Sequence, residues 1–436
     1  MKRLSVLLAS CLLLSGPSIA ATESASLSAS ASENLAKNVQ PQVVKWRRHF
    51  HQHPELSNEE FNTGKTVAKA LEDMGIKVET GIAGAGLTGF LQGSKPGPTV
   101  ALRADMDGLP VVEQTDLPFA SKTQGKYRGK DVGVMHACGH DAHMAILLGV
   151  AKSLSDIKND LAGNVLFIFQ PAEEGLPAGE VGGAELMLKE GLFEKHKPDV
   201  VYGLHVWSAL NTGTVAYRSG PAMASADVFE IVIKGKQTHG SRPWGGVDPI
   251  VVAAQTIMAV QTIASRQVDV TKAPSIISFG IVEGGVRNNI IPDSVKLVGT
   301  IRNFDMGIRA QIHQKIKHTA KHVALAAGAE ADVTINLGYP VMVNDPALVK
   351  ATLPSLLKVV GDANLIESDL VTGAEDFAYF ANEIPGFYYF VGVTPKGVNA
   401  KTAPSNHSPY FDIEESAMQV GVQTLLQSTL DYMARH

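Results

Sequence analysis

Short, almost continuously apolar segments constrain the fold of this 436-residue chain more than any other feature. They lie at residues 98–104, 164–170, 200–206 and 387–393, and helical patterns such as residues 144–154 come between them. A strand that is apolar on both faces is typical of a parallel sheet that helices cover on both sides. The sequence therefore predicts an α/β protein with a mainly parallel sheet.

A different pattern fills residues 222–337. Residues 227–234 alternate between apolar and polar, as in a strand with one exposed face. The further elements expected here are a helix at 248–264, strands at 275–282 and 294–303, a helix at 305–327 and a strand at 331–337. This β-α-β-β-α-β order predicts a small open-faced α+β sheet with two helices on one side.

Two domains are also what the length suggests, because one hydrophobic core seldom fills 436 residues. The α/β pattern returns after residue 338. We therefore predict a larger domain in two parts, residues 37–221 and 338–436, interrupted by a smaller domain at residues 222–337.

The N-terminus has the pattern of a secretory signal peptide. A basic start at Lys2-Arg3 precedes an apolar run at residues 4–14, and small residues end at Ala20. We expect residues 1–20 to be removed and the protein to be periplasmic or secreted, without stable membrane insertion. A lipid anchor on Cys11 is a less favoured alternative, since it leaves a short apolar core. Residues 21–36, rich in Ser and Ala at their start, are predicted to be a disordered spacer.

Composition and cysteine content limit the classes of function. A formal net charge of -5 gives no basic surface for nucleic acid, so a small-molecule ligand is favoured. With Cys11 in the signal, Cys138 is the only cysteine of the mature chain, so no internal disulfide can form. Metal ligation explains an unpaired cysteine in an exported protein, and a redox role is weaker because no resolving cysteine exists.

Acidic residues follow two of the predicted strands. Asp105 and Asp107 come directly after residues 98–104, and the pair Glu173-Glu174 comes after residues 164–170. Ligands of open parallel sheets bind at the carboxyl ends of the strands, so these groups can converge. Asp105 could orient a metal-ligating histidine, whereas Asp107 could equally cap a turn. One of the two glutamates could bind metal while the other accepts a proton from water.

Metal-ligating side chains are densest in residues 135–143, MHACGHDAH. Cys138 and His140 are two residues apart in a loop and suit zinc or another transition metal. His136 and His143 could be ligands or structural residues. The residues alone thus predict a water-activating metal site with Cys138, His140 and one glutamate. They identify neither the substrate nor the number of metal ions.

These clusters belong to a series of motifs that resembles a known family. The motifs are RADMDGLP, MHACGHDAHMA, QPAEEG, GLHVW, THGSRPWGGVDPI, GGVRNNIIPD, GTIRNFD, TGAEDFAYF and NHSPYF. In this order they are similar to the dinuclear metalloamidohydrolases and metallopeptidases that include hippurate hydrolase, aminoacylases and auxin-conjugate hydrolases. The resemblance implies a catalytic domain with two divalent metal ions, interrupted by an inserted lid or dimerisation domain.

The resemblance also implies roles for single residues. Glu173 would be the general base, and Asp105 would support the site from behind. In the lid, His239 would polarise the scissile carbonyl, while Asn289 and Arg302 would contact the substrate. The ions would be zinc or manganese, with cobalt or nickel as alternatives. The metal ligands would be Cys138, His140, Glu174, His205 and His407, with the Cys138 thiolate between the two metals.

The expected reaction is hydrolysis of the amide bond of an N-acyl amino acid by metal-bound water that Glu173 activates. Alternatives are a dipeptidase or carboxypeptidase and a catalytically silent metal-binding protein on the same fold. In related enzymes the lid histidine can come from a partner subunit, so a homodimer through the inserted domain is an expectation. The chain departs from its relatives at Trp244 in the lid and at Asn406 beside the last ligand.

Overall fold

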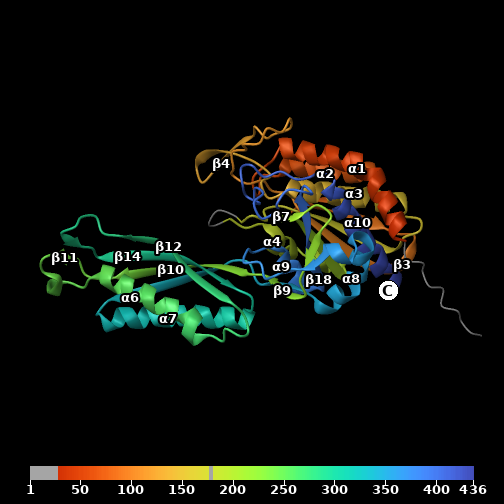
Figure 1. Ribbon diagram of the computed structural model, residues 1–436. Helices are drawn as coiled ribbons and strands as arrows, with labels where there is room; N and C mark the ends of the chain where they lie inside the picture. The colour runs from red at the N-terminus through yellow and green to blue at the C-terminus, as the bar shows by residue number, and fades with distance from the viewer. Residues whose placement is uncertain (1–27, 176–179) are drawn as a thin grey trace, which may run out of the picture.

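The computed structural model describes residues 28–175 and 180–436. Figure 1 shows a larger body that contains the C-terminus and a smaller, elongated body that extends away from it. The predicted signal peptide and residues 21–27 of the predicted spacer lie outside the described residues, so export stays a prediction. Within the part that the structure describes, no helix is both long and apolar enough to cross a membrane.

The larger body is built on an eight-stranded mixed sheet with strand order β1-β2-β6-β3-β7-β18-β8-β17. Its four central strands run parallel, whereas β1 and β2 are antiparallel at one edge. The predicted fold class is therefore confirmed. The strands are β1 (Lys77–Ile82), β2 (Gly86–Gln92), β3 (Lys95–Asp105), β6 (Ala162–Gln170), β7 (Val200–Asn211), β8 (Val215–Tyr217), β17 (Leu365–Glu367) and β18 (Gly386–Thr394).

Helices cover both faces of this sheet, which explains its continuously apolar strands. On β3, Val100 and Leu102 belong to one buried cluster, while Ala101 between them belongs to another on the opposite face. The first cluster takes in α1 (Ala29–Gln52), α2 (Phe61–Asp73), α3 (His140–Asp156), α8 (Pro346–Val360) and α10 (Ala417–Arg435). The second takes in α4 (Gly183–Lys189), α5 (Leu192–His196) and α9 (Phe377–Glu383).

Helix α1 corrects the prediction that the spacer extends to residue 36, because the helix already begins at Ala29. Ser28 caps it by accepting a hydrogen bond from the Ala31 amide. Ser32 Oγ donates to Gln427 Oε1 of α10 at 2.7 Å, and Ala36 is fully buried. A composition rich in Ser and Ala is typical of a disordered spacer, but alanine also favours helix wherever tertiary contacts support it.

The smaller body has a four-stranded antiparallel sheet with strand order β12-β14-β10-β15. Its hydrophobic cluster is separate from those of the larger body. In Figure 1 its two helices lie together along the sheet, and β11 lies at the end farthest from the larger body. The elements are β10 (Ser225–Lys234), α6 (Pro249–Thr262), β12 (Ser275–Gly284), β14 (Ser294–Asn303), α7 (Met306–Ala326), β15 (Glu330–Leu337), and the short β11 (Thr238–His239) and β13 (Ile290–Ile291).

Paired strands form the junction between the two bodies, and a cluster of ion pairs lies just inside the smaller body. β9 (Gly220–Met223) enters the smaller body, and β16 (Met342–Asn344) pairs with it on the return. Just beyond β9, Asp227 accepts hydrogen bonds from Arg309 and from His313 Nε2 of α7. These contacts tie α7 to the start of β10, where the smaller domain begins.

Candidate metal centre

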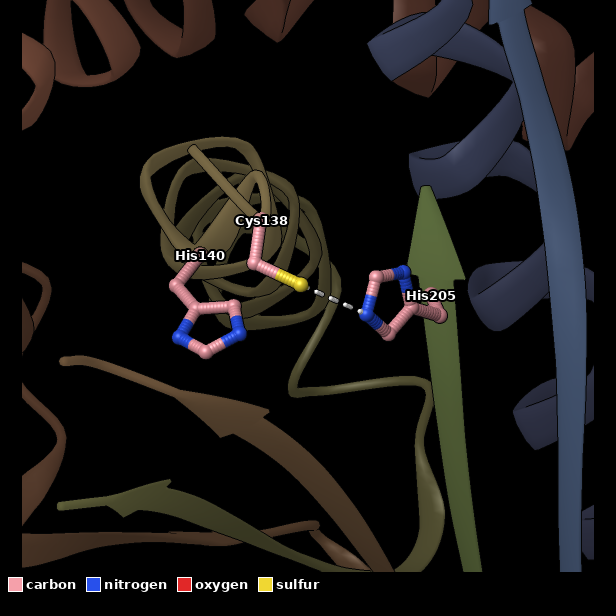
Figure 2. Close-up of side chains that lie close together, drawn as sticks. All are labelled: Cys138, His140 and His205. Atoms are coloured by element: carbon pink, nitrogen blue, oxygen red, sulfur yellow. Dashed lines mark hydrogen bonds between the residues drawn. The ribbon is translucent and has the colours of Figure 1, made fainter. Parts of the chain in front are cut away.

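The structure brings the five predicted ligands together at the carboxyl ends of β3, β6 and β7. Cys138 Sγ lies 3.3 Å from His205 Nε2 and 3.3 Å from His407 Nε2. Figure 2 shows the Cys138 sulfur directed at the His205 ring, with His140 on its other side. Cys138, His140 and His205 are buried, whereas His407 is more exposed. Segments far apart in sequence therefore converge on one sulfur atom.

Hydrogen bonds to backbone carbonyls fix the orientation of two of these histidines. His140 Nδ1 donates to the Asp107 carbonyl at 2.8 Å, and His205 Nδ1 donates to the Val206 carbonyl at 2.7 Å. Each bond leaves the Nε2 lone pair free for a metal, as in most histidine metal sites. His140 Nε2 is buried without a hydrogen-bond partner among the described residues.

The glutamate pair lies against the same histidines. Glu174 Oε1 is 3.1 Å from His407 Nε2, and Glu173 Oε2 is 3.9 Å from His140 Nε2. The turn that carries them has Ala172 at φ 56° and Gly175 at φ 87°. Asp107 holds this turn because its carboxylate accepts hydrogen bonds from the backbone amides of both glutamates. Asp107 is thus a support of the site as well as a turn residue.

The donor set fits a pair of transition-metal ions. Cys138, His140 and His205 form one group of ligand atoms within 4.8 Å, and Cys138, Glu174 and His407 form a second. The shared sulfur gives each group one soft ligand beside nitrogen or carboxylate donors. Burial raises the pKa of the Cys138 thiol, and the carboxylates of Glu174 and Glu173 raise it further. A thiolate at this position therefore requires cations to balance its charge.

The two histidines left open by the sequence differ from the ligands. Both nitrogens of His143 are engaged, since Nδ1 donates to Asp105 Oδ1 at 2.6 Å and Nε2 accepts from the Val206 amide at 2.9 Å. His143 is therefore a structural residue that fixes Asp105 and β7. His136 is buried and lies in none of the ligand groups found among the described residues.

A buried ion network supports the centre from behind. Arg103 donates to Gln170 Oε1 and Asp105 Oδ2, each at 2.8 Å, and to Asp376 Oδ1 at 2.9 Å. Glu375 Oε1 lies 3.0 Å from the same guanidinium. Since Gln170 ends β6, this network joins the strand that carries the glutamate pair to the strand that carries Asp105. Sequence reasoning assigned no role to Glu375 and Asp376, although the motif TGAEDFAYF contains both.

The environment of Glu173 suits a residue that holds a proton during part of the reaction. Burial raises the pKa of its carboxyl, and the nearby carboxylates of Glu375 and Glu174 add to the effect. The Tyr339 hydroxyl donates to the Glu173 carbonyl oxygen and fixes the backbone. A buried carboxyl with a raised pKa holds a proton more readily than an exposed one.

Asn406 fastens three ligand-bearing segments to one another. Its Nδ2 donates to the carbonyls of Cys138 and Val206, both at 3.1 Å, while its Oδ1 accepts from the Ser208 amide and hydroxyl. Its neighbour His407 has φ 71°, and the His407 amide donates to the Ala137 carbonyl. The departure at position 406 thus adds hydrogen bonds around the centre.

The three predicted lid residues do not lie together. His239 of β11 and Asn289 are neighbours, because the Gly240 amide donates to the Asn289 carbonyl and β11 pairs with β13. This pair lies at the tip of the inserted domain, away from the metal centre of its own chain (Figure 1). Arg302 pairs with Ala226 at the opposite end of the sheet, next to the junction. Trp244 is 81% exposed at the tip.

Comparisons with known proteins agree with the motifs. Thermostable carboxypeptidase 1 of Saccharolobus solfataricus is 38% identical over 391 residues, which cover 89% of this chain and 95% of the relative. N-acetyl-L-cysteine deacetylase of Bacillus subtilis is 37% identical, and the match covers 87% of this chain and 85% of the relative. The crystal structure of Bacillus subtilis YXEP protein, described as a dinuclear metal binding peptidase from the M20 family, is 32% identical with a TM-score of 0.77. That match covers 91% of this chain and 99% of the solved one.

Peptidase family M20/M25/M40 matches residues 101–431, which is most of the chain. The family resemblance inferred from the motifs is confirmed by this match. The chain therefore belongs to peptidase family M20/M25/M40 and is a hydrolase that acts on amide or peptide bonds.

Proposed function

We propose that this protein hydrolyses the amide bond of N-acyl amino acids with the help of two divalent metal ions. The observation that carries the proposal is the convergence of Cys138, His140, Glu174, His205 and His407 beside the buried carboxyl of Glu173. Zinc or manganese suits this mixture of sulfur, nitrogen and oxygen donors. The deacetylase relative acts on an N-acyl amino acid, which supports this substrate class.

Glu173 is the residue that moves the proton. When bound, the metal ions would polarise the scissile carbonyl and lower the pKa of water near it. The Glu173 carboxylate takes a proton from the attacking water and then delivers it to the nitrogen of the leaving amino acid. Asp107 fixes the backbone of Glu173 through its amide, so the carboxylate stays directed at the reacting atoms.

Arg302 is the candidate partner for the substrate carboxylate. Its side chain is half-buried in β14 at the end of the inserted sheet next to the junction, and burial lowers its pKa from the ordinary value. A guanidinium stays charged even so, and its planar fork binds carboxylates through two hydrogen bonds. A free α-carboxylate on the substrate would therefore face the inserted domain.

A second copy of the chain is the proposed source of His239 and Asn289. Strand β11, which carries His239 and pairs with β13 beside Asn289, lies at the end of the smaller body farthest from the larger one (Figure 1). The edge strand β12 exposes Ile281 and Val282, and α6 carries Met258, which is 71% exposed. An apolar edge strand beside an apolar helix face suits pairing with the same surface of another copy.

The first experiment replaces Glu173 with glutamine. We expect Glu173→Gln to lower kcat by about 10²–10⁴-fold, because the proton carrier is lost while the ligands remain. Amine release from N-acetyl and N-benzoyl amino acids measures activity, and elemental analysis measures bound metal. Glu194→Gln, an exposed residue of α5, is the matched control. A near-normal rate in Glu173→Gln would reject the assignment.

Subunit mixing tests the shared site. Glu173→Gln and His239→Ala are each expected to be nearly inactive alone. In a mixed dimer, one site would combine an intact Glu173 from one copy with an intact His239 from the other. Random exchange should restore about a quarter of wild-type activity. Recovery no greater than the sum of the two separate variants would reject a shared site.

An exopeptidase is the second candidate function, because the carboxypeptidase relative acts through the same family fold. The two functions use the same metal centre and differ in the group on the acyl side of the bond. A panel of N-acyl amino acids and dipeptides, assayed after chelation and metal addition, separates them. Hydrolysis of dipeptides alone would favour the exopeptidase.

A further inference from the structure

A cavity of about 400 Å³ opens beside the metal centre and has no role in the mechanism above. Glu174 is one of its lining residues, so the cavity reaches a candidate metal ligand. Its other walls come from the loop after α1, from Leu109 and Pro110, and from the hairpin of β4 (Gln124–Tyr127) and β5 (Lys130–Gly133). Cavities of this size are typical of small-molecule sites.

The hairpin is a stiff wall. Tyr127 pairs with Lys130, and the two residues between them, Arg128 and Gly129, both have positive φ angles of 51° and 76°. A two-residue turn of this kind matches the twist of its strands and therefore holds the hairpin in one register. At the hairpin base, a side chain on Gly125 would come within 3.0 Å of Leu56 Cδ1, so the backbone packs closely on that residue.

The wall formed by the loop after α1 is tied to the glutamate pair. Ser57 Oγ donates to Asp107 Oδ2 at 2.7 Å, and the same carboxylate group accepts the Glu173 and Glu174 amides. Asn58 Nδ2 donates to the Val181 carbonyl at 3.2 Å. A ligand between this wall and the hairpin would therefore have a fixed position relative to Glu174.

The lining combines apolar side chains with charged ones of both signs, and the acidic members besides Glu174 are Glu59 and Glu180, both exposed. Leu56 is buried, and Leu109, Pro110 and Tyr127 are half-buried along the walls. The charged side chains of Lys126 and Arg128 are exposed, and the Arg128 guanidinium lies 5.3 Å from the centre of the Tyr127 ring. Packing of the guanidinium on one face restrains the ring and leaves its remaining surface for contact with a ligand.

We propose that this cavity receives the acyl group of the substrate, that it selects bulky apolar acyl groups, and that Tyr127 determines this selectivity. The proposal rests on the proposed function and deepens it. The lining contains no residue of the inserted domain, which carries Arg302, the candidate partner of the substrate carboxylate. The carboxylate and the acyl group therefore point to different sides of the metal centre.

The test compares N-benzoyl and N-acetyl derivatives of one amino acid with the metal-loaded enzyme. We expect wild type to prefer the benzoyl substrate. Tyr127→Ala should lower kcat/KM for the benzoyl substrate by about tenfold or more while the acetyl substrate changes less than about twofold. Tyr127→Phe should keep the preference, because the ring supplies the contact. Lys130→Ala, across the hairpin and outside the lining, is the matched control and should match wild type.

A benzoyl-to-acetyl ratio that Tyr127→Ala leaves unchanged would overturn the proposal while the proposed function stands. Titration calorimetry with benzoate and acetate keeps the cavity testable without turnover. Wild type should bind benzoate more tightly, and Tyr127→Ala should lose that difference. If no acyl amino acid is hydrolysed, the proposed function fails. The calorimetric comparison alone then tests whether the cavity prefers a bulky apolar group. Equal binding of benzoate and acetate by wild type would overturn it.

Discussion

Beneath the metal centre, the larger domain encloses Arg103 among the carboxylates of Asp105, Glu375 and Asp376, whereas the inserted domain exposes His239 and Trp244 at its tip. In the larger domain the same buried contacts hold the strands and position the candidate metal ligands. In the inserted domain the core lies between sheet and helices, and the proposed contact residues lie outside it. A substitution beneath the metal centre should therefore lower both stability and activity. A substitution at the tip of the inserted domain should lower activity with little effect on stability.

Arg47 offers the largest expected effect in the larger domain. It is buried in α1 and donates to Asp141 Oδ2 and Asp412 Oδ1, both at 2.9 Å. Arg47→Met leaves Asp141 buried without this partner, next to the candidate ligand His140. We expect unfolding to become easier by about 3–5 kcal/mol, as urea denaturation would measure, with a parallel loss of metal binding.

The next residue in sequence is the matched control. Arg48 forms an ion pair too, but on the exposed side of α1: its guanidinium lies 2.7 Å from Glu415 Oε2. Arg48→Met should cost less than about 1 kcal/mol because solvent screens exposed ion pairs. Equal effects of the two substitutions on the free energy of unfolding would show that burial does not determine how much each ion pair contributes.

Asn406→Leu tests whether a single neutral side chain is needed to position the candidate metal ligands. The change removes the hydrogen bonds that join the loop of His407 to Cys138 and Val206. We expect metal affinity to fall by about 10–100-fold while the fold remains. Chelator competition measures the affinity, and Asn399→Leu in the preceding exposed loop is the control. Unchanged affinity would mean that backbone contacts alone position His407.

The fold was predictable from sequence to the extent that burial produces a pattern. Strands covered on both faces, such as 164–170, are almost continuously apolar, and half-exposed strands, such as 294–303, alternate. The structure has strands at both places. The start of α1 was not predictable, because Ser28 to Ala36 lack an apolar period of their own and gain stability from α10. Local composition does not predict a helix whose stability comes from contacts with an element distant in sequence.

The candidate site was predictable where ligand types cluster in sequence. Residues 135–143 concentrate metal ligands within one segment, so their chemistry stands out. Glu375, Asp376 and the Asn406 hydrogen bonds were not predictable, since each acts through groups distant in sequence, such as Arg103. The position of His239 also depends on the three-dimensional arrangement, because a motif does not reveal on which end of a sheet a residue lies.

Asp227 gives the inserted domain its own pH dependence. Burial alone would raise its pKa, but hydrogen bonds from Arg309 and His313 outweigh this and lower the pKa to about 2. The folded value lies below the unfolded one, so the stabilisation is present above about pH 4 and is lost as the pH falls towards 2. We expect a contribution of about 1–2 kcal/mol after allowance for solvent screening.

Thermal unfolding of wild type and Asp227→Asn at decreasing pH measures this contribution. The variant should be less stable near neutral pH and should approach wild type in acid. Asp332→Asn, which removes the exposed partner of Lys234 on the same sheet, is the control and should not alter the pH profile. A constant difference between wild type and Asp227→Asn at every pH would contradict the titration of Asp227.

Trp244→Ala should have the smallest effect on stability and gives the sharpest separation of the two regions. The side chain is 81% exposed in a short turn beside β11, so we expect the free energy of unfolding to change by less than about 0.5 kcal/mol. If a second copy places this tip over the metal centre, kcat/KM should still fall severalfold, because an exposed aromatic side chain gains its contacts on assembly. Val286→Ala, 92% exposed in the neighbouring β12–β13 loop, is the control. A loss of stability above about 1 kcal/mol would show that Trp244 packs within its own chain, and the contrast between an enclosed centre and an exposed tip would then fail at this residue.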